Sequence, residues 1–228
     1  MSSLVGFVGT RKAKNILFAC LARMEYRGYD SAGIATTFSG KMYSYKFAGK
    51  LCGLKEYVDK NPSPGTIGLG HLRWASHGPA THKNAHPHLS EDGLVAVVHN
   101  GILENYKELK DKLKRRGNVF LSDTDSEVIA HVIAEHLTDG RDLFAAVAYS
   151  LPLFEGVYTL AVMSSLQSNV LIGACQGNKL VIAQSAQGTF LISDHSALPD
   201  GVEKKAFVES YQLCTVKAGS FHVIDRAR

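Results

Sequence analysis

The 228-residue chain lacks any long hydrophobic run. No stretch approaches the roughly 18 consecutive apolar residues that a membrane-spanning helix requires. The apolar run near the start is interrupted by Gly6 and Gly9 and has no basic segment before it, so it does not resemble a secretory signal peptide. We therefore expect a cytoplasmic protein without a membrane partner.

Cysteine is scarce and dispersed. The cysteines are Cys20, Cys52, Cys175 and Cys214, and no two of them form a Cys-x-x-Cys pair. Such spacing offers neither a disulfide framework nor a thiolate zinc site. We interpret them as buried thiols of a reducing compartment.

Charge of one sign is not concentrated anywhere in the chain. Lysine and arginine number 25 against 21 aspartate and glutamate residues, which leaves a net charge of +4. The densest basic stretch, Lys107 to Arg116, alternates with acids and is typical of a solvated helix face. A nucleic-acid partner is therefore not expected.

The overall composition is that of an ordinary globular protein. Hydrophobic residues make up 45% of the chain and charged residues 20%, which excludes disorder, collagen and coiled coil. No repeat, low-complexity segment or linker interrupts it. We therefore treat residues 1–228 as one domain.

Hydrophobic periodicity predicts helices and strands along the whole chain. Apolar residues in 13–24 follow helical spacing, and Leu4–Val8 is typical of a buried strand. Ser39-Gly40 predicts a hairpin between strands at 33–38 and 42–48. Further helices are expected at 51–58, 103–113, 125–137 and 142–151, and further strands at 67–74, 94–99, 157–163, 170–174, 180–183, 190–192, 207–216 and 221–224.

The order of these elements indicates the fold class. Strands follow strands and helices occur in pairs, which favours an α+β fold with a largely antiparallel sheet over βαβ winding. The helices fall into two sequential groups. Such groups could cover two faces of stacked sheets.

A first candidate site is the pair Asn100-Gly101 at the predicted end of a strand. Glycine allows a tight turn and leaves its backbone N–H free to face a ligand. With the neighbouring side-chain amide, this N–H could hold one oxyanion. An ordinary Asn-Gly turn explains the same pair.

Two further side chains could bind charged groups of a ligand. Arg73 closes a predicted strand, and its planar guanidinium suits a carboxylate, with Trp74 beside it as an apolar lid. A surface arginine and a core tryptophan would be equally consistent. Asp125 could receive an ammonium group or simply cap the following helix.

Histidine is the one abundant chemical group, with ten residues in the chain. The segment with His82, His86 and His88 could supply imidazole ligands to zinc. It has no carboxylate or thiolate ligand at short spacing, so we predict no metal site and interpret these residues as loop or core histidines.

Several motifs become informative when taken together. In chain order they are Glu25–Gly33, Gly70–Gly78, Asn84–His88, Val98–Asn105 and Ser122–Ile129. This series closely resembles the glutaminase domain of the glutamine–fructose-6-phosphate aminotransferases, which are class II glutamine amidotransferases. The resemblance runs from about residue 4 to residue 165 and is looser to residue 228.

The resemblance implies a fold and a chemistry. The fold would be that of an N-terminal-nucleophile (Ntn) hydrolase, a four-layer αββα sandwich with two stacked antiparallel sheets. The reaction would be hydrolysis of L-glutamine to L-glutamate and ammonia, without a cofactor. In the full enzyme the ammonia serves glucosamine 6-phosphate synthesis, and the partner is a sugar-isomerase domain or subunit in a homo-oligomer.

The resemblance also implies roles for individual residues. Arg73 would bind the α-carboxylate of glutamine and Asp125 its α-amino group, while Asn100 and the Gly101 N–H would form the oxyanion hole. Arg27 with Gly28 would hold the terminal strand. The loop that closes over glutamine would contain Trp74, Ser76 and His77, and His86 would support that loop.

The nucleophile departs from the family pattern. The family begins Met-Cys-Gly-Ile-Val-Gly, and after removal of Met the Cys thiol attacks the amide while its own α-amine accepts the proton. This chain begins Met-Ser-Ser-Leu-Val-Gly, so Ser2 stands in place of the Cys and Ser3 in place of the Gly. A hydroxyl is far less ionisable than a thiol.

Three interpretations follow from this replacement. We favour a glutaminase domain of normal ancestry with slow turnover; the others are a working serine amidase and a glutamine-binding pseudo-enzyme. A second departure lies at Cys175–Leu180, where the family has Arg-x-Gly-Ser-Pro-Leu. This change concerns contacts with the sugar-isomerase part more than the fold.

Overall fold

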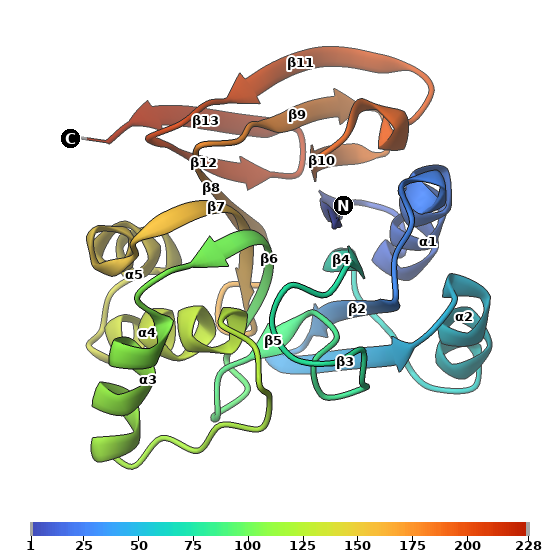
Figure 1. Ribbon diagram of the computed structural model, residues 1–228. Helices are drawn as coiled ribbons and strands as arrows, with labels where there is room; N and C mark the ends of the chain where they lie inside the picture. The colour runs from blue at the N-terminus through green and yellow to red at the C-terminus, as the bar shows by residue number, and fades with distance from the viewer. Residues whose placement is uncertain (1, 227–228) are drawn as a thin grey trace.

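The computed structural model describes residues 2–226 (Figure 1). Its strands are β1 (Ser3–Gly9), β2 (Ser31–Phe38), β3 (Lys41–Ala48), β4 (Ile67–Arg73), β5 (His88–Leu89), β6 (Val95–Leu103), β7 (Gly156–Ser164), β8 (Val170–Gln176), β9 (Leu180–Ser185), β10 (Gly188–Ile192), β11 (Val202–Val208), β12 (Gln212–Lys217) and β13 (Ser220–Asp225). Its α-helices are α1 (Ala13–Met24), α2 (Leu51–Asp59), α3 (Tyr106–Arg115), α4 (Ser126–Thr138) and α5 (Leu143–Ser150).

The strands form two sheets in which every pairing of named strands is antiparallel. The first sheet has the order β11-β9-β10-β1-β4-β2-β3, and the second has the order β13-β12-β8-β7-β6-β5. The central strand β1 is paired on one side with β10 and on the other with β4. The start of the chain therefore lies in the middle of the first sheet.

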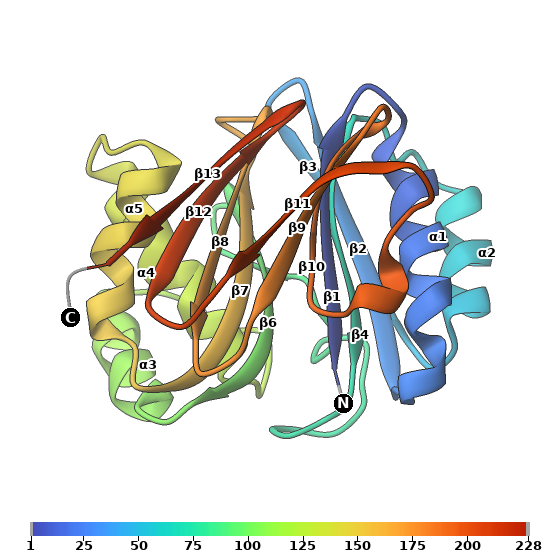
Figure 2. The ribbon, with the colours of Figure 1, turned by 90° about the horizontal axis from the view of Figure 1, so that it is seen from above.

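Helices cover the outer face of each sheet. Helices α1 and α2 pack on the first sheet, and α3, α4 and α5 lie on the side of the second (Figure 2). Three hydrophobic cores fill the three spaces between layers, one under each helical layer and one between the sheets. The expected four-layer αββα sandwich is confirmed.

The central strand shows why the sequence adopts this arrangement. Val5 and Phe7 of β1 pack under α1, whereas Leu4 and Val8 on the opposite face lie in the core between the sheets. Both faces are buried, so the strand is continuously apolar instead of alternating. Helix α4 is likewise buried along most of its length, including the polar residues Ser126, Glu127 and His131.

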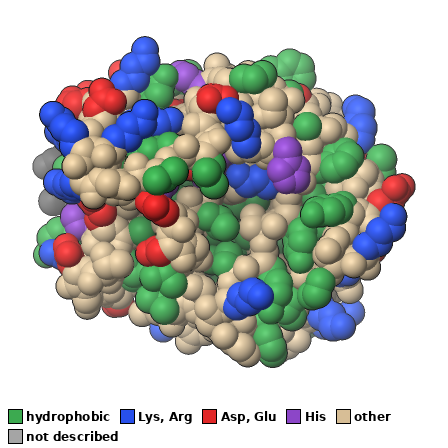
Figure 3. Space-filling model, turned by 90° about the horizontal axis from the view of Figure 1, so that it is seen from below, with side chains coloured by type: hydrophobic (Ala, Val, Ile, Leu, Met, Phe, Trp, Pro, Cys, Tyr) green, Lys and Arg blue, Asp and Glu red, His purple; other side chains and the backbone are tan. Residues whose placement is uncertain are grey.

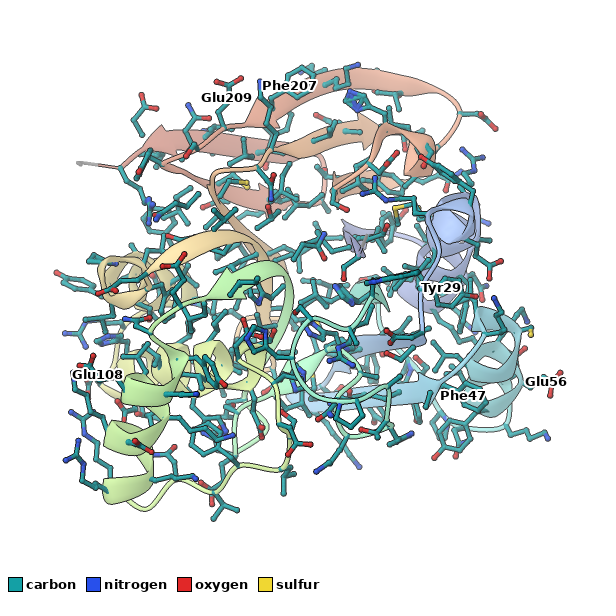
Figure 4. The ribbon with its side chains drawn as sticks, in the orientation of Figure 1. Tyr29, Phe47, Glu56, Glu108, Phe207 and Glu209 are labelled. Carbon is teal, nitrogen blue, oxygen red and sulfur yellow. The ribbon has the colours of Figure 1, made fainter. Side chains whose placement is uncertain are left out.

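The outer layer next to the first sheet is fixed by aromatic side chains. The hydroxyl of Tyr29 accepts a hydrogen bond from the backbone N–H of Leu51, at the start of α2, over 2.8 Å. Phe47 of β3 packs into the same core, and Figure 4 shows both aromatic residues beside the helices of this layer. Among the described residues, no helix has the length and apolar character to cross a membrane.

Some predicted boundaries are wrong. Asn100-Gly101 does not end its strand, because β6 continues to Leu103 in unbroken register with β7. The predicted strand at 207–216 is two strands, since the chain turns at Tyr211, where φ is 65°. That turn contains no glycine or proline to signal it. Cys52 is exposed on α2, and only the other cysteines are buried.

A close backbone approach connects the first sheet to the segment before β5. A Cβ atom added to Gly33 of β2 would lie 2.0 Å from the carbonyl oxygen of His86. Only glycine leaves room for this crossing. The strand therefore sets the position of His86 and of the residues that follow it.

We expect Gly33→Ala to destabilise the fold by about 1–3 kcal/mol, because the backbone must move apart. Urea unfolding measures the change in the free energy of unfolding. The control is Gly40→Ala in the hairpin turn, where φ is +73° and a Cβ meets nothing within 4 Å. There the loss should stay near the roughly 1 kcal/mol of a left-handed backbone. Equal losses in the two variants would contradict the crowding at Gly33.

Candidate active site

A cavity of about 480 Å³ lies at the start of β1, at the end of β4 and beside Asn100 and Gly101 within β6. The predicted site residues that line it are Ser2, Arg27, Trp74, Ser76, Asn100 and Gly101. Thr159, Asn178, Lys179 and Ser193 complete the lining. Of the remaining predicted residues, Gly28, Arg73, His77, His86 and Asp125 do not line this cavity.

Ser2 is held in the cavity by the end of β4. The backbone N–H of Trp74 donates a hydrogen bond to Ser2 Oγ over 3.0 Å. The residues after Ser2 are anchored from the far end of the sequence, because the Leu4 N–H donates to Ser193 Oγ over 2.9 Å. The α-amine expected to serve as base depends on removal of Met1, which lies outside the described residues.

Ser3 is buried behind the cavity. Its side chain is fully buried in β1, opposite Leu72 of β4, and its Oγ has no hydrogen-bond partner among the described residues. A buried hydroxyl without a partner loses its hydration and gains nothing in exchange. The serine that replaces the family's glycine therefore carries an energetic cost.

The backbone of β6 presents one edge to the site. Beyond its short pairing with β5 at Val97 and Ala96, β6 is paired only with β7. On its other edge, the His99 N–H donates to His86 Nδ1 and the Leu103 N–H donates to Asp125 Oδ2. Because the N–H groups of alternate residues in a strand point to the same edge, the Gly101 N–H also points away from β7.

Gly101 can only be glycine. Its φ of +135° is a conformation that other residues rarely adopt, and a Cβ would lie 2.0 Å from the Val157 carbonyl oxygen. The predicted left-handed freedom of this residue is therefore real, although it serves a strand and not a turn. Its N–H is available as a hydrogen-bond donor at the cavity.

The side chain of Asn100 is oriented by His71, a residue that the sequence did not point to. His71 Nε2 lies 3.1 Å from the His99 carbonyl oxygen and 2.8 Å from Asn100 Oδ1. A carbonyl can only accept, so Nε2 carries the proton and the amide atom beside it is the oxygen. The Asn100 NH2 group is thereby left as a donor for the cavity.

His71 and His86 both bond the backbone of His99. Their rings stack with centroids 4.2 Å apart, and while His71 donates to the His99 carbonyl, His86 accepts from the His99 N–H. His88 packs edge-on against His86 with ring centroids 4.6 Å apart. The structure thus places His86 against β6, next to Asn100 and Gly101.

These imidazoles are uncharged in the folded chain. Burial lowers the pKa of His71 to about 3 and outweighs the hydrogen bond from its ring to Asn100. Burial also places the pKa values of His86 and His88 well below the ordinary value for histidine. A neutral His71 keeps one fixed tautomer, which is what the orientation of Asn100 requires.

Arg73 is buried at the end of β4 and holds the loop that follows. Its guanidinium donates to the carbonyl oxygens of His77, Gly78 and Pro79, with Asp30 3.9 Å away. Burial lowers the pKa of Arg73, and Asp30 and Asp125 partly offset this effect. An α-carboxylate would compete with the loop carbonyls for these N–H donors.

Asp125 does not cap its helix. It is the residue before α4, yet no side-chain capping bond forms, and its carboxylate instead accepts the Leu103 N–H over 2.8 Å. His99 and Ser126 also approach it, and only 3% of the residue is exposed. Its charge therefore lies beneath the end of β6.

Arg27 and Trp74 form the open side of the cavity. Arg27 forms an ion pair with Asp194, which follows β10. This pair connects the turn after α1 to β10, the strand beside β1. Trp74 is 58% exposed, so the alternative of a core tryptophan is wrong. A Cβ on Gly28 would lie only 3.0 Å from the Trp74 ring, so glycine there lets the ring lie close.

The loop after Trp74 carries the remaining predicted residues. Ser76 reaches the cavity, whereas the His77 ring packs edge-on against Tyr106 at 5.4 Å. The Ala75 N–H donates to Asp30. The loop is therefore held at its start by Asp30 and farther along by Arg73.

The downstream departure from the family pattern reaches the site. Asn178 and Lys179 line the cavity, and Lys179 forms an ion pair of 2.8 Å with Glu209. Cys175 lies fully buried in the core between the sheets. The sequence indicates only an effect on contacts outside the site. The β8–β9 turn reaches the cavity because Gly177 pairs with Tyr158 near the start of β7, a contact that only the folded sheet brings about.

The histidines do not form a metal centre in residues 2–226. No group of three or more His, Cys, Asp or Glu side chains is placed to hold a metal ion there. His82 is exposed, while His86 and His88 are buried and bonded to other protein groups.

Comparison with known proteins agrees with this geometry. Residues 58–221 match the family model of the glutamine amidotransferase domain. The chain belongs to the class II glutamine amidotransferase family. The glutamine–fructose-6-phosphate aminotransferase of Gluconobacter oxydans is 42% identical over 226 residues, which is 99% of this chain and 37% of that protein. That of Thermus thermophilus is 44% identical over 198 residues, or 87% of this chain and 32% of that protein.

The chain thus spans about a third of the length of the curated relatives that it matches. Among solved structures, the glutamine phosphoribosylpyrophosphate amidotransferase of Bacillus subtilis superposes with a TM-score of 0.81 at 23% identity, over 98% of this chain and 49% of that one. A class II domain protein from Silicibacter pomeroyi gives a TM-score of 0.64 at 14% identity, over 99% of this chain and 100% of that one. These similarities show an Ntn-hydrolase fold.

The neutral buried histidines predict that acid destabilises the domain. In the unfolded chain, histidine binds a proton below about pH 6.5. In the folded chain, His71, His86 and His88 stay uncharged at that pH. The free energy of unfolding should therefore fall as the pH drops from about 6.5 toward 4.5. Each residue contributes a slope of up to about 1.4 kcal/mol per pH unit. Urea unfolding at several pH values measures it.

Replacing His88 by glutamine should make that slope shallower by up to one histidine's contribution. The exposed His82→Gln variant controls for loss of an imidazole at the surface. An unfolding free energy that is flat between pH 6.5 and 4.5 would show that the three rings are not held neutral.

The unpartnered hydroxyl predicts a stabilising substitution. Ser3→Ala should raise the free energy of unfolding by about 1 kcal/mol, because it removes a buried group that makes no hydrogen bond. The control is Ser122→Ala, which should lower it, since the buried Ser122 Oγ donates to Glu127 over 2.6 Å. A loss of stability in Ser3→Ala would mean that the hydroxyl has a partner.

Proposed function

We propose that this chain is the glutaminase part of a glutamine–fructose-6-phosphate aminotransferase and binds L-glutamine in the cavity that contains Ser2. The observation that carries the proposal is the edge of β6. There the Gly101 N–H and the Asn100 NH2 group, oriented by His71, are donors at a cavity that also contains a hydroxyl.

The residues suit acyl transfer from an amide. The Ser2 oxygen attacks the side-chain carbonyl carbon of glutamine, and the α-amine of Ser2, once Met1 is removed, accepts the hydroxyl proton. The carbonyl oxygen becomes an oxyanion that Asn100 and Gly101 stabilise by hydrogen bonds. Collapse expels ammonia, which takes the proton back from the amine. Water then hydrolyses the ester to glutamate and free Ser2.

Recognition of the amino acid is assigned to two buried charges. Arg73 binds the α-carboxylate in exchange for loop carbonyls, so the loop at 77–79 rearranges when glutamine binds. Asp125 binds the α-amino group. Assignment of both residues to one ligand is supported by the attraction between Arg73 and Asp125. The charge of Asp125 raises the pKa of Arg73 and partly offsets the effect of burial.

The wider role follows from the relatives. Their length is about three times that of this chain, and they are named for an aminotransferase reaction with fructose 6-phosphate. We propose that the ammonia released here serves glucosamine 6-phosphate synthesis by a sugar-isomerase domain or subunit, within a homo-oligomer.

Turnover should be slow because of the nucleophile. A serine hydroxyl is much harder to deprotonate than a cysteine thiol, and the α-amine that must accept its proton titrates near 7.7–8.0. Ser3 adds a second burden, since its side chain occupies a position where the family has none. Both departures lie in the strand that presents the nucleophile.

Ammonia release from glutamine tests the proposal. Intact mass of the purified chain first shows whether Met1 has been removed. We expect the Ser2→Cys, Ser3→Gly double variant to exceed the unmodified chain in kcat by at least about 100-fold, because a thiol is the better nucleophile at neutral pH. In that background, Asn100→Ala should lower kcat by about 10²–10³ with little change in KM.

The other outcomes separate the alternatives. Equal rates for the unmodified chain and the double variant would show a working serine amidase. Glutamine binding by calorimetry without ammonia release, even in the double variant, would indicate a glutamine-binding pseudo-enzyme. Failure to bind glutamine at all would overturn the proposed function.

A further inference from the structure

A second cavity lies between the two sheets on the opposite side of the His86–His88 segment. Its volume is about 520 Å³, and it shares no lining residue with the cavity of Ser2. Its walls come from β3 and β5, which are the edge strands of the two sheets, from α4 and from the segment before α4. Figure 3 shows this side of the molecule, where basic, histidine and hydrophobic side chains lie together.

Lys46 is the only strand lysine in this lining, and it points between the sheets. Side chains alternate along β3, so Ser44 and Lys46 lie on the same face as Met42, which packs against the core between the sheets. Tyr45 and Phe47 face the helices instead. The ammonium group is therefore directed into the sandwich and not toward the outer layer.

Lys46 forms no close ion pair within residues 2–226. Glu127 acts on it only from a longer distance, where its charge raises the pKa of Lys46 against the effect of burial. No carboxylate lies within 4.0 Å of its Nζ, and the one hydrogen bond is a long one of 3.4 Å to the carbonyl of Lys83. Burial lowers the pKa of Lys46 to about 8. The Oγ of Ser44, on the same face, is buried without a partner among the described residues.

The acids of this cavity are occupied elsewhere. Glu127 accepts hydrogen bonds from the N–H groups of Leu121 and Ser122 and from the Ser122 hydroxyl. Glu91 accepts the N–H of Val119. Both carboxylates therefore hold the segment before α4 in place, and neither forms a close ion pair with Lys46.

The opening of the cavity is apolar. Val119 and Leu121 are 56% and 76% exposed, although both line the cavity. Leu89 lines it from β5. A molecule seated here would therefore meet a cation and a hydroxyl inside, and would cover exposed hydrophobic surface at the rim.

We propose that this second cavity binds a small organic carboxylate, with its charge on Lys46 and its apolar body against Val119 and Leu121. The carboxylate supplies the close ion-pair partner that Lys46 lacks and an acceptor for the Ser44 hydroxyl. The apolar body gains by leaving water at the two exposed side chains. This site is independent of the glutaminase activity.

Calorimetric titration of the full chain with benzoate, acetate, benzamide and inorganic phosphate tests the proposal. Benzoate should bind at least tenfold more tightly than acetate, which has the charge without the body, and than benzamide, which has the body without the charge. Phosphate binding tighter than benzoate would assign the site to phosphate compounds and overturn the carboxylate assignment.

The variants place the binding in the cavity. Lys46→Met should weaken benzoate at least tenfold, while Lys112→Met, at an exposed lysine that pairs with Glu108 over 2.6 Å and does not line the cavity, should stay within twofold. Leu121→Ser changes an exposed residue that the fold does not need, and it should weaken benzoate but not acetate. Equal binding of benzoate and benzamide, or an unaltered benzoate affinity in both Lys46→Met and Leu121→Ser, would overturn the proposal.

Discussion

The hydrogen bonds along the free edge of β6 are the interaction on which the candidate site depends. One sheet edge bonds, in sequence, to His86, to His71 and to Asp125. Each of these groups comes from a different element, and each is buried. Their spacing leaves Gly101 as the one outward N–H between two satisfied neighbours. The direction of the Gly101 N–H therefore follows from the alternation of N–H groups along β6. The side chains that bond the neighbouring residues hold this edge of the strand in place.

Much of the fold could be predicted from the sequence, because apolar periodicity reports burial directly. The apolar stripe at residues 13–24 predicted helix α1, and the continuous apolar segment at residues 4–8 predicted strand β1. The structure contains both. The strand through Asn100-Gly101 could not be found this way, since glycine breaks a strand in most settings and here is required by the Val157 carbonyl. The turn at Tyr211 was not predicted for the opposite reason, because it contains no glycine or proline to mark the end of a strand.

The candidate site was predictable as a set of residues and not as a set of contacts. Motifs brought Asn100, Gly101 and Ser2 into consideration, and all three line one cavity. The bond from His71 to Asn100 joins residues of two strands in different sheets, so local spacing carries no signal of it. The same holds for Lys179, which enters the site because the β8–β9 turn lies beside it. Such pairings come from the stacking of the sheets.

The placement of β1 between β10 and β4 has a consequence for the order in which the molecule can be completed. The residues that fix Leu4 next to Ser2 include Ser193, which is separated from it by 189 positions. A growing chain that has not yet reached β10 already contains Ser2 and β1 but lacks the strands that complete one side of the sheet around them. The sheet around Ser2 can thus be completed only after the chain has been synthesised as far as β10 and Ser193.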